Sequence, residues 1–171
     1  MMKNWYFIYG PMFAQKSTKL QSFIKNCKQN HIILKHSLDT RYGIGEIVTH
    51  DDTRVACKNI NSRTDLREFL SPAEHLSIFI DEAQFFAADI LEELFDYEGK
   101  VYFCGLDMNY LGELFPISAK LLEILPAENK LHLKAICECG NFATHSKYIG
   151  EKKDTIVIVG TQYKPVCAEC F

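Results

Sequence analysis

The chain has 171 residues, a length that fits one main domain with its own hydrophobic core and a small appendage. Its net charge of −3, without a block of lysine and arginine, argues against a protein that binds nucleic acid by neutralising phosphates. No apolar run reaches the length of a membrane span, so no membrane partner is expected. The opening residues Met1–Asn4 contain no leader, which predicts a cytoplasmic protein, and seven cysteines fit that compartment as thiols or metal ligands.

Short apolar runs alternate with helical patterns along most of the chain. The predicted strands are Trp5–Tyr9, Ile32–Leu34, Leu76–Ile80 and Val101–Cys104, and the predicted helices are Ser17–Asn30, Thr64–Leu70 and Ala87–Tyr97. Strands separated by helices predict βαβ units and a parallel sheet, which is an α/β fold. The stretch Arg41–Asp52, with Gly43 and Gly45, is expected to form a mobile loop.

The character of the sequence changes after about Leu131. Paired cysteines gather in this last part, and the β-branched run Asp154–Gly160 is typical of a strand. The sequence therefore predicts a boundary near residue 130, between a nucleotide-binding α/β domain at 1–130 and a small cysteine-held lobe at 131–171.

Residues 10–18 read Gly-Pro-Met-Phe-Ala-Gln-Lys-Ser-Thr, close to the G-x-x-x-x-G-K-[ST] pattern of a phosphate-binding loop. Gly10, Lys16 and Ser17 stand at the required positions, but Gln15 occupies the place of the second glycine. A strand before the loop and a helix after it supply the context that gives this motif its meaning. If the position needs a left-handed backbone, Gln15 costs about 1–2 kcal/mol there, and its side chain crowds the phosphates.

An apolar strand that ends in a carboxylate follows at Ile78-Phe79-Ile80-Asp81-Glu82. Phosphoryl-transfer folds hold Mg²⁺ with an aspartate at such a strand end, and the adjacent Glu82 is suited to accept a proton from an attacking hydroxyl. Alone, the string is weak evidence and is more typical of an aspartate that caps the next segment, followed by a solvated glutamate. The phosphate loop on a separate strand favours the catalytic interpretation.

Several strings together carry a resemblance to a known family. They are Gly10-Pro11-Met12-Phe13 with Lys16-Ser17-Thr18, then Asp81-Glu82-Ala83-Gln84-Phe85-Phe86, then Gly105-Leu106-Asp107 with Phe115, and a closing Tyr-x-x-x-Cys-x-x-Cys from Tyr163 to Cys170. In this order, over essentially the whole chain, they resemble the zinc-containing, cellular type of thymidine kinase. The resemblance implies a sheet like that of P-loop NTPases, flanked by helices, with a small C-terminal zinc-binding lobe.

What the resemblance implies begins with the chemistry. Members of this family transfer the γ-phosphate of ATP to the 5′-hydroxyl of thymidine. By resemblance Glu82 is the general base, Lys16 and the loop amides hold the phosphates, and Ser17 and Asp81 belong to a Mg²⁺ site. Arg41 matches a family motif near the phosphates, where an arginine stabilises developing charge, although a loop arginine is also commonly just solvated. The implied ATP and Mg²⁺ residues are Gly10, Pro11, Met12, Phe13, Ala14, Gln15, Lys16, Ser17, Thr18, Asp39 and Asp81.

The same resemblance implies a thymidine pocket, part of it from the backbone of a long loop in the C-terminal lobe. Its implied residues are Met12, Glu82, Phe85, Leu106, Tyr110, Phe115, Ser146, Ile156, Ile158, Gly160 and Tyr163. From the sequence alone, Met12, Phe13 and Leu106 fit the core equally well. Phe85 and Phe86 are adjacent, so they point in different directions and at least one of them is expected in the core.

Four cysteines in the last part of the chain, Cys137, Cys139, Cys167 and Cys170, favour a structural Zn²⁺ over free thiols. The second pair has the usual two-residue spacing, whereas the first pair is separated by a single residue. Glu138 and His145 are alternative ligands. The other cysteines, Cys27, Cys57 and Cys104, are expected to be small buried hydrophobes.

The chain departs from the family pattern at Gln15, at the shortened cysteine pair and at Gly160-Thr161-Gln162-Tyr163, which is two residues shorter than usual. We expect Gln15 to weaken ATP affinity or turnover. The resemblance also implies a homotetramer with small-molecule substrates, inhibited by the end-product triphosphate. Two other interpretations stay open: a nucleotide-binding relative without activity, and a zinc-ribbon module that binds nucleic acid.

Overall fold

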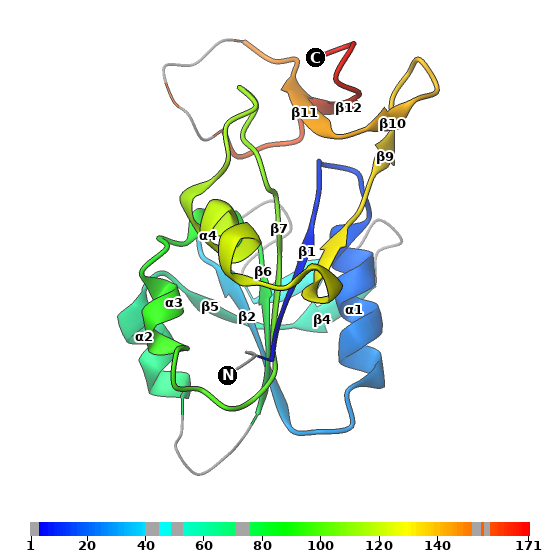
Figure 1. The fold of residues 1–171 in the computed structure, drawn as a ribbon. Helices are drawn as coiled ribbons and strands as arrows, with labels where there is room; N and C mark the ends of the chain where they lie inside the picture. The colour runs from blue at the N-terminus through cyan, green and yellow to red at the C-terminus, as the bar shows by residue number, and fades with distance from the viewer. Residues whose placement is uncertain (1–3, 40–44, 49–52, 71–75, 152–154, 156–157) are drawn as a thin grey trace.

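The computed structural model describes residues 4–39, 45–48, 53–70, 76–151, 155 and 158–171. Its centre is a six-stranded parallel sheet (Figure 1). In spatial order the strands are β5 (Lys58–Ile60), β2 (His31–His36), β6 (Ser77–Asp81), β7 (Val101–Gly105), β1 (Trp5–Tyr9) and β8 (Lys130–His132). The predicted α/β class with a parallel sheet is confirmed.

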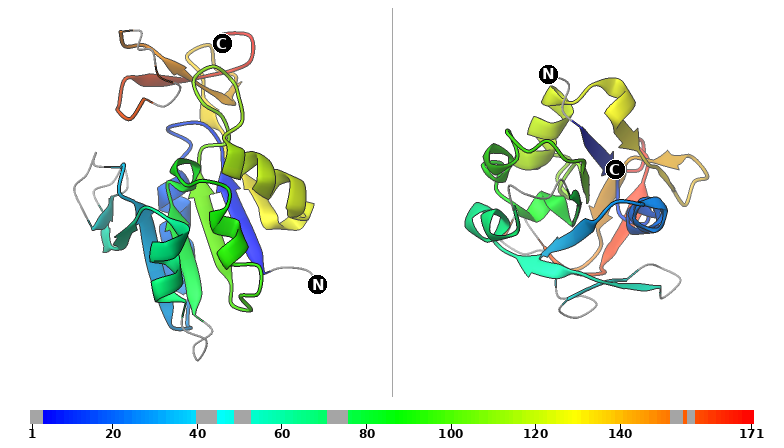
Figure 2. Two further views of the ribbon diagram at one scale, coloured as in Figure 1. Left: turned by 90° about the vertical axis from the view of Figure 1, so that its left-hand side faces the viewer. Right: turned by 90° about the horizontal axis from the view of Figure 1, so that it is seen from below.

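Helices cover both faces of this sheet (Figures 1 and 2). Helix α1 (Lys16–Asn26) lies on one face, and α2 (Arg63–Phe69), α3 (Ile90–Glu93) and α4 (Pro116–Ile124) lie on the other. Short 3₁₀ turns, η1 (Ala83–Phe85) and η2 (Ala127–Asn129), follow β6 and α4. The arrangement leaves the carboxyl ends of the strands at one edge, where ligands bind in open α/β sheets.

The core reflects the two-residue period of the strands. On β1, Trp5 and Phe7 point into a cluster that includes Leu66 of α2 and Leu121 of α4. Ile8 points to the opposite face, where it joins Leu20 and Ile24 of α1 in a second cluster. Because both faces of the strands are buried, the strands read as continuous apolar runs, and this made them recognisable in the sequence.

Two helices begin where local chemistry favours it. Ser62 and Asp65 form a reciprocal capping box at the start of α2. Pro116 occupies the first turn of α4, where its missing N–H costs nothing. Helix α4 is not among the predicted helices, although buried Ile117 and Leu121 lie one turn apart on it.

The prediction of a helix at Ala87–Tyr97 is wrong in its extent. Only Ile90–Glu93 is α-helical, and the flanking backbone bonds are of the 3₁₀ type, such as Ile90 N–H to Ala87 O and Tyr97 N–H to Leu94 O. Tight turns bury the same apolar side chains that a longer helix would bury. The predicted helix Ser17–Asn30 likewise ends at Asn26, because Cys27 turns to an extended backbone.

The predicted loop at Arg41–Asp52 contains a strand. Residues Glu46–Val48 form β3, which pairs antiparallel with β4 (Arg54–Ala56). Ile47 is buried in the cluster under α1, and that packing fixes the strand. Residues 41–44 and 49–52 lie outside the described part of the chain.

A small lobe lies over the carboxyl edge of the sheet (Figure 1). It consists of the strand pairs β9 (Ala135–Ile136) with β10 (Phe142–Ala143) and β11 (His145–Tyr148) with β12 (Tyr163–Val166). The predicted strand at Asp154–Gly160 does not form at the described residues Thr155 and Ile158–Gly160, and its other residues lie outside the description. Among the described helices, none has the length and apolar character needed to cross a membrane.

Candidate active site

The phosphate-loop motif forms the connection between β1 and α1, at the carboxyl edge of the sheet. Its backbone has positive φ angles at Gly10 (143°), Phe13 (64°) and Gln15 (58°). Gln15 therefore has a left-handed backbone directly before α1, at the place where the pattern has glycine. Strained backbone of this kind gathers at functional sites when the surrounding fold enforces it.

Lys16, the first residue of α1, points its ammonium group back into this loop. Its Nζ donates a hydrogen bond to the carbonyl oxygen of Pro11 at 2.7 Å. Burial lowers the pKa of Lys16, and the nearby Cys104, Glu82 and Asp81 act in the opposite direction. A cation inside a loop of backbone amides is the arrangement that binds a chain of phosphates.

Asp81 and Ser17 bring two oxygen ligands together. Asp81 is the last residue of β6, and Ser17 Oγ donates to its Oδ2 at 3.4 Å. Burial and, to a smaller extent, the nearby charge of Glu82 raise the pKa of Asp81 to about 7. A hydroxyl next to a carboxylate offers the hard oxygen donors that Mg²⁺ prefers, so these residues fit a magnesium ion carried by a nucleotide.

Glu82 follows in a left-handed turn with φ 54° and ψ 42°. Its backbone N–H donates to Asp81 Oδ1 at 3.0 Å, and its carboxylate accepts a hydrogen bond from Gln84 at 2.6 Å. A non-glycine residue with this backbone is uncommon, and the turn directs Glu82 away from the line of the strand.

Two adjacent cavities open at this edge and share Met12, Glu82 and Leu106. The first cavity brings together the predicted residues Met12, Phe13, Gln15, Lys16, Ser17, Thr18, Asp39, Asp81, Glu82 and Leu106. The second brings together the predicted residues Met12, Glu82, Phe85, Leu106, Tyr110, Phe115, Ser146, Ile158, Gly160 and Tyr163. Gly10, Pro11 and Ala14 belong to the loop without lining either cavity. Arg41 and Ile156 lie outside the described residues.

Several residues that line the cavities are not among the predicted site residues. They are Lys35, Glu46–Val48, Gly105 and Thr161 in the first cavity, and Gln84, Met108, Asn109 and Val159 in the second. Lys35 is buried, with its Nζ 2.9 Å from the carbonyl oxygen of Glu46 and 3.4 Å from Asp39 Oδ2. It lies opposite Asp81 in the register of β2 and β6, and no sequence pattern reveals that pairing.

Tyrosines from the small lobe and from the segment after β7 cover the second cavity. Tyr110 donates its hydroxyl to the carbonyl oxygen of Thr155 at 3.0 Å, and Tyr163 donates to that of Ile158 at 2.7 Å. The ring of Tyr148 is close to both, with its centroid 5.9 Å from that of Tyr110 and 5.1 Å from that of Tyr163. An apolar wall with backbone groups at its rim suits a flat heterocyclic base. Phe85 lines this cavity while Phe86 is buried, as expected for adjacent side chains.

The small lobe also contacts the phosphate loop directly. The backbone N–H of Met12 donates to Ser146 Oγ on β11 at 2.9 Å. Ala14 packs in one apolar cluster with Cys137, Cys167 and Ala143 of the lobe. The loop is therefore held by the sheet on one side and by the lobe on the other.

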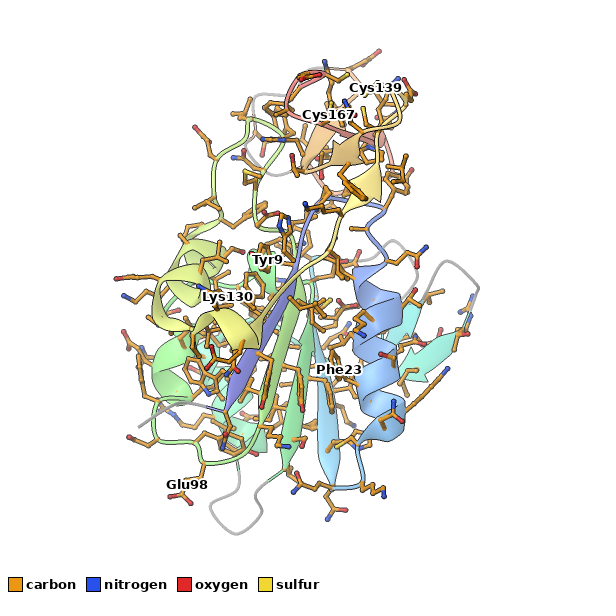
Figure 3. The ribbon with its side chains drawn as sticks, turned by 45° about the vertical axis from the view of Figure 1, so that its right-hand side comes forward. Tyr9, Phe23, Glu98, Lys130, Cys139 and Cys167 are labelled. Carbon is orange, nitrogen blue, oxygen red and sulfur yellow. The ribbon has the colours of Figure 1, made fainter. Side chains whose placement is uncertain are left out.

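The four predicted metal ligands come together in the lobe. The sulfur atoms of Cys137, Cys139, Cys167 and Cys170 all lie within 4.8 Å of one another. Cys139 and Cys167, labelled in Figure 3, have their sulfurs 3.6 Å apart. Tetrahedral Zn²⁺ with bonds of about 2.3 Å separates its sulfur ligands by about 3.8 Å, so the cluster fits zinc despite its shortened first pair. Backbone N–H groups of Cys139 and Cys167 lower the pKa of Cys137 to about 6, whereas hydrogen bonding with the other three sulfurs raises the pKa of Cys170 to about 12.

The chain is similar to known proteins along most of its length. A family model described as thymidine kinase matches residues 3–171. The chain is 35% identical to a thymidine kinase of Bacteroides fragilis and 34% identical to one of Bacteroides thetaiotaomicron, in each case over 96% of this chain and 84% of the relative. It is 29% identical to a thymidine kinase of Pseudothermotoga lettingae, over 96% of this chain and 92% of the relative.

Proposed function

The chain belongs to the thymidine kinase family, and we propose that it transfers the γ-phosphate of ATP to the 5′-hydroxyl of thymidine, supplying thymidine monophosphate for nucleotide salvage and DNA synthesis. The observation that carries this proposal is the pair of cavities that meet at Glu82. One cavity has the features of a phosphate site and the other those of a nucleoside site. The comparisons favour neither a non-catalytic relative nor a nucleic-acid-binding module.

The proposed mechanism begins with Glu82 as the general base. Its position on the shared wall of the cavities lets it accept the proton of the 5′-hydroxyl as that oxygen attacks the γ-phosphorus. The attacking 5′-oxygen and the departing ADP oxygen lie in line with the phosphorus. Most of the rate enhancement then comes from holding the two substrates in this alignment and from stabilising charge.

The phosphates are assigned to the loop. Lys16 exchanges its present bond to Pro11 for contacts with phosphate oxygens, and the backbone amides of residues 10–18 surround them. Ser17 and Asp81 hold the nucleotide's Mg²⁺, which when bound neutralises charge on the phosphates. Asp39 lies at the wall of the same cavity and is assigned to the phosphates as well. Arg41 joins this set by resemblance alone.

The thymidine assignment rests on the second cavity. Phe85, Leu106 and Phe115 supply apolar walls, and Tyr110 and Tyr163 supply the cover. Met12, Ser146, Ile158 and Gly160 belong to the same set, and Ile156 joins them by resemblance alone. Although the segment Gly160–Tyr163 is short, Tyr163 lines this cavity, as the assignment requires.

The four-cysteine cluster supports a structural Zn²⁺ in the lobe. We further propose a division near residue 130 into a nucleotide-binding domain and a zinc-binding lobe. A cytoplasmic homotetramer that uses small-molecule substrates rather than nucleic acid, and that is inhibited by the end-product triphosphate, follows from the family resemblance.

The test is ADP release from MgATP, measured with and without thymidine, together with mass spectrometry of the nucleoside product. We expect thymidine to stimulate release and to gain one phosphate at its 5′ position. Glu82→Gln, measured in parallel, is expected to lose the stimulation. Release that does not respond to thymidine, in zinc-loaded and folded protein, would support the non-catalytic relative instead. A gel shift with single-stranded DNA tests the third interpretation, which predicts a retarded band.

A further inference from the structure

Gln84 is buried beside Glu82, and both ends of its amide are engaged. Its Nε2 donates to Glu82 Oε2 at 2.6 Å, and its Oε1 accepts the backbone N–H of Leu106 at 3.0 Å. Only 4% of the residue's surface is exposed. The side chain therefore links the residue assigned as base to a residue in the wall of the nucleoside cavity.

The orientation of this amide has only one solution. A backbone N–H can donate and never accept, so the atom facing Leu106 must be the amide oxygen. The amide NH₂ then faces Glu82, where a charged carboxylate strengthens the hydrogen bond. A hydrocarbon or a carboxylate at position 84 cannot make this pair of contacts.

The surrounding fold fixes both partners of Gln84. Leu106 is held a second time, because its carbonyl oxygen accepts Ser118 Oγ from α4 at 2.7 Å. Gly105 leaves room for the amide, since a Cβ there would lie 2.5 Å from Gln84 Oε1. Glu82 itself has the strained left-handed backbone described above.

We propose that Gln84 is a positioning residue that holds the carboxylate of Glu82 at a set place relative to the nucleoside wall. This inference rests on the proposed role of Glu82 as the base. Without Gln84 the carboxylate loses a hydrogen bond that fixes one of its oxygens. Its position relative to the 5′-hydroxyl is then less well defined. A small displacement of a catalytic base lowers the rate of reaction strongly, even where the substrate still binds.

Gln84→Met tests the proposal, because methionine keeps the length of the side chain and removes both hydrogen bonds. We expect kcat to fall about 10- to 100-fold, with thymidine affinity within about threefold of the parent. Gln84→Glu keeps an oxygen that accepts the N–H of Leu106 but loses the NH₂ group that donates to Glu82. It therefore tests the bond to Glu82 separately from the bond to Leu106. It is expected to lose kcat at least as severely, since two carboxylates then face each other. Melting temperature and zinc content show that each variant is folded.

The double variant Glu82→Gln with Gln84→Met distinguishes positioning from general structural support. If Gln84 acts through Glu82, the double variant is no slower than Glu82→Gln alone. Full additivity of the two losses, or a kcat for Gln84→Met within twofold of the parent, overturns the inference. An active Glu82→Gln variant would instead overturn the assignment of the base, so the two failures are distinguishable.

Discussion

Gln15 has a left-handed backbone at the glycine position of the phosphate loop, and its exposed side chain lines the first cavity. We predict that Gln15→Gly raises the free energy of unfolding by about 0.5–1 kcal/mol, because the relief of backbone strain is partly offset by the greater freedom of glycine in the unfolded chain. The KM for ATP should fall as well, since the loop then opens fully to phosphate. Chemical denaturation and steady-state kinetics measure the two effects.

Gln15→Ala is the matched control for that prediction. Alanine retains the Cβ and therefore the strain, but it removes the part of the side chain that reaches into the cavity. A fall in KM without added stability would separate crowding from strain. An unchanged or lower kcat/KM in Gln15→Gly would show that glutamine is no handicap here.

Asp81 gives the protein a pH dependence in Mg²⁺-free buffer. The native pKa of about 7 lies above the value of an unfolded aspartate, so between about pH 4 and 7 the native state binds a proton that the unfolded state has lost. This group's contribution to stability therefore falls as pH rises through that window, and it levels off above pH 7. Denaturation curves across the window should show the decline, and Asp81→Asn should flatten it. A decline of equal size in Asp81→Asn would assign the effect to other groups.

At the scale of the elements, the junction between β1 and the phosphate loop depends on close backbone approach. Leu133 donates its N–H to the carbonyl oxygen of Tyr9 at 2.7 Å, and a Cβ on Gly10 would lie 2.0 Å from the carbonyl oxygen of Leu133. We predict that Gly10→Ala destabilises the protein by roughly 2–4 kcal/mol and impairs ATP binding, because backbone has to move. Thermal melting and ATP titration measure both.

Gly45→Ala is the control for this clash. Gly45 also has a positive φ, 86°, but the nearest atom to an added Cβ is 3.7 Å away. Gly45→Ala should lower the free energy of unfolding by only about 1 kcal/mol, which is the strain of the backbone alone. If Gly10→Ala and Gly45→Ala lose the same amount of stability, the close contact between Gly10 and Leu133 is not important.

The sequence predicted those elements whose burial leaves a pattern in the chain. Strands such as Trp5–Tyr9 are apolar because both of their faces are covered. The three residues of β8 carry no such signal, because they form an edge strand whose side chains are partly buried or exposed. Around α3, the apolar residues fit both a long helix and the observed 3₁₀ turns, and only the packing decides between them.

The candidate site was predictable where a motif encodes it in consecutive residues. The phosphate loop and the Asp81–Glu82 pair are of this kind. Lys35 was not predictable as a lining residue, because its proximity to Asp81 depends on the register of two strands that are far apart in sequence. Gln84 was quoted within a motif, but its link between Glu82 and Leu106 exists only in three dimensions.

At the scale of the whole molecule, the cysteine lobe packs directly against the phosphate loop. Ser146 holds the backbone of Met12, and Ala14 packs against Cys137 and Cys167. We predict that Cys170→Ser reduces the zinc content, lowers the melting temperature by about 5–15 °C and weakens ATP binding. Elemental analysis, thermal melting and ATP titration measure these effects.

Cys57→Ser is the control, because Cys57 packs against the apolar cluster under α1 and does not belong to the four-cysteine cluster. It should keep the zinc content and the ATP affinity of the parent. Loss of zinc from Cys170→Ser with unchanged ATP affinity would show that the lobe does not support the loop.

We propose above all that Glu82 takes the proton of the 5′-hydroxyl where the two cavities meet. The most direct test is a single-turnover measurement of thymidine monophosphate formation by the parent and by Glu82→Gln, with ATP and thymidine affinities determined separately. Glu82→Gln is expected to bind both substrates within about threefold of the parent while the rate of phosphoryl transfer falls about 10²- to 10⁴-fold. A transfer rate within a few-fold of the parent would contradict the claim and place the base elsewhere.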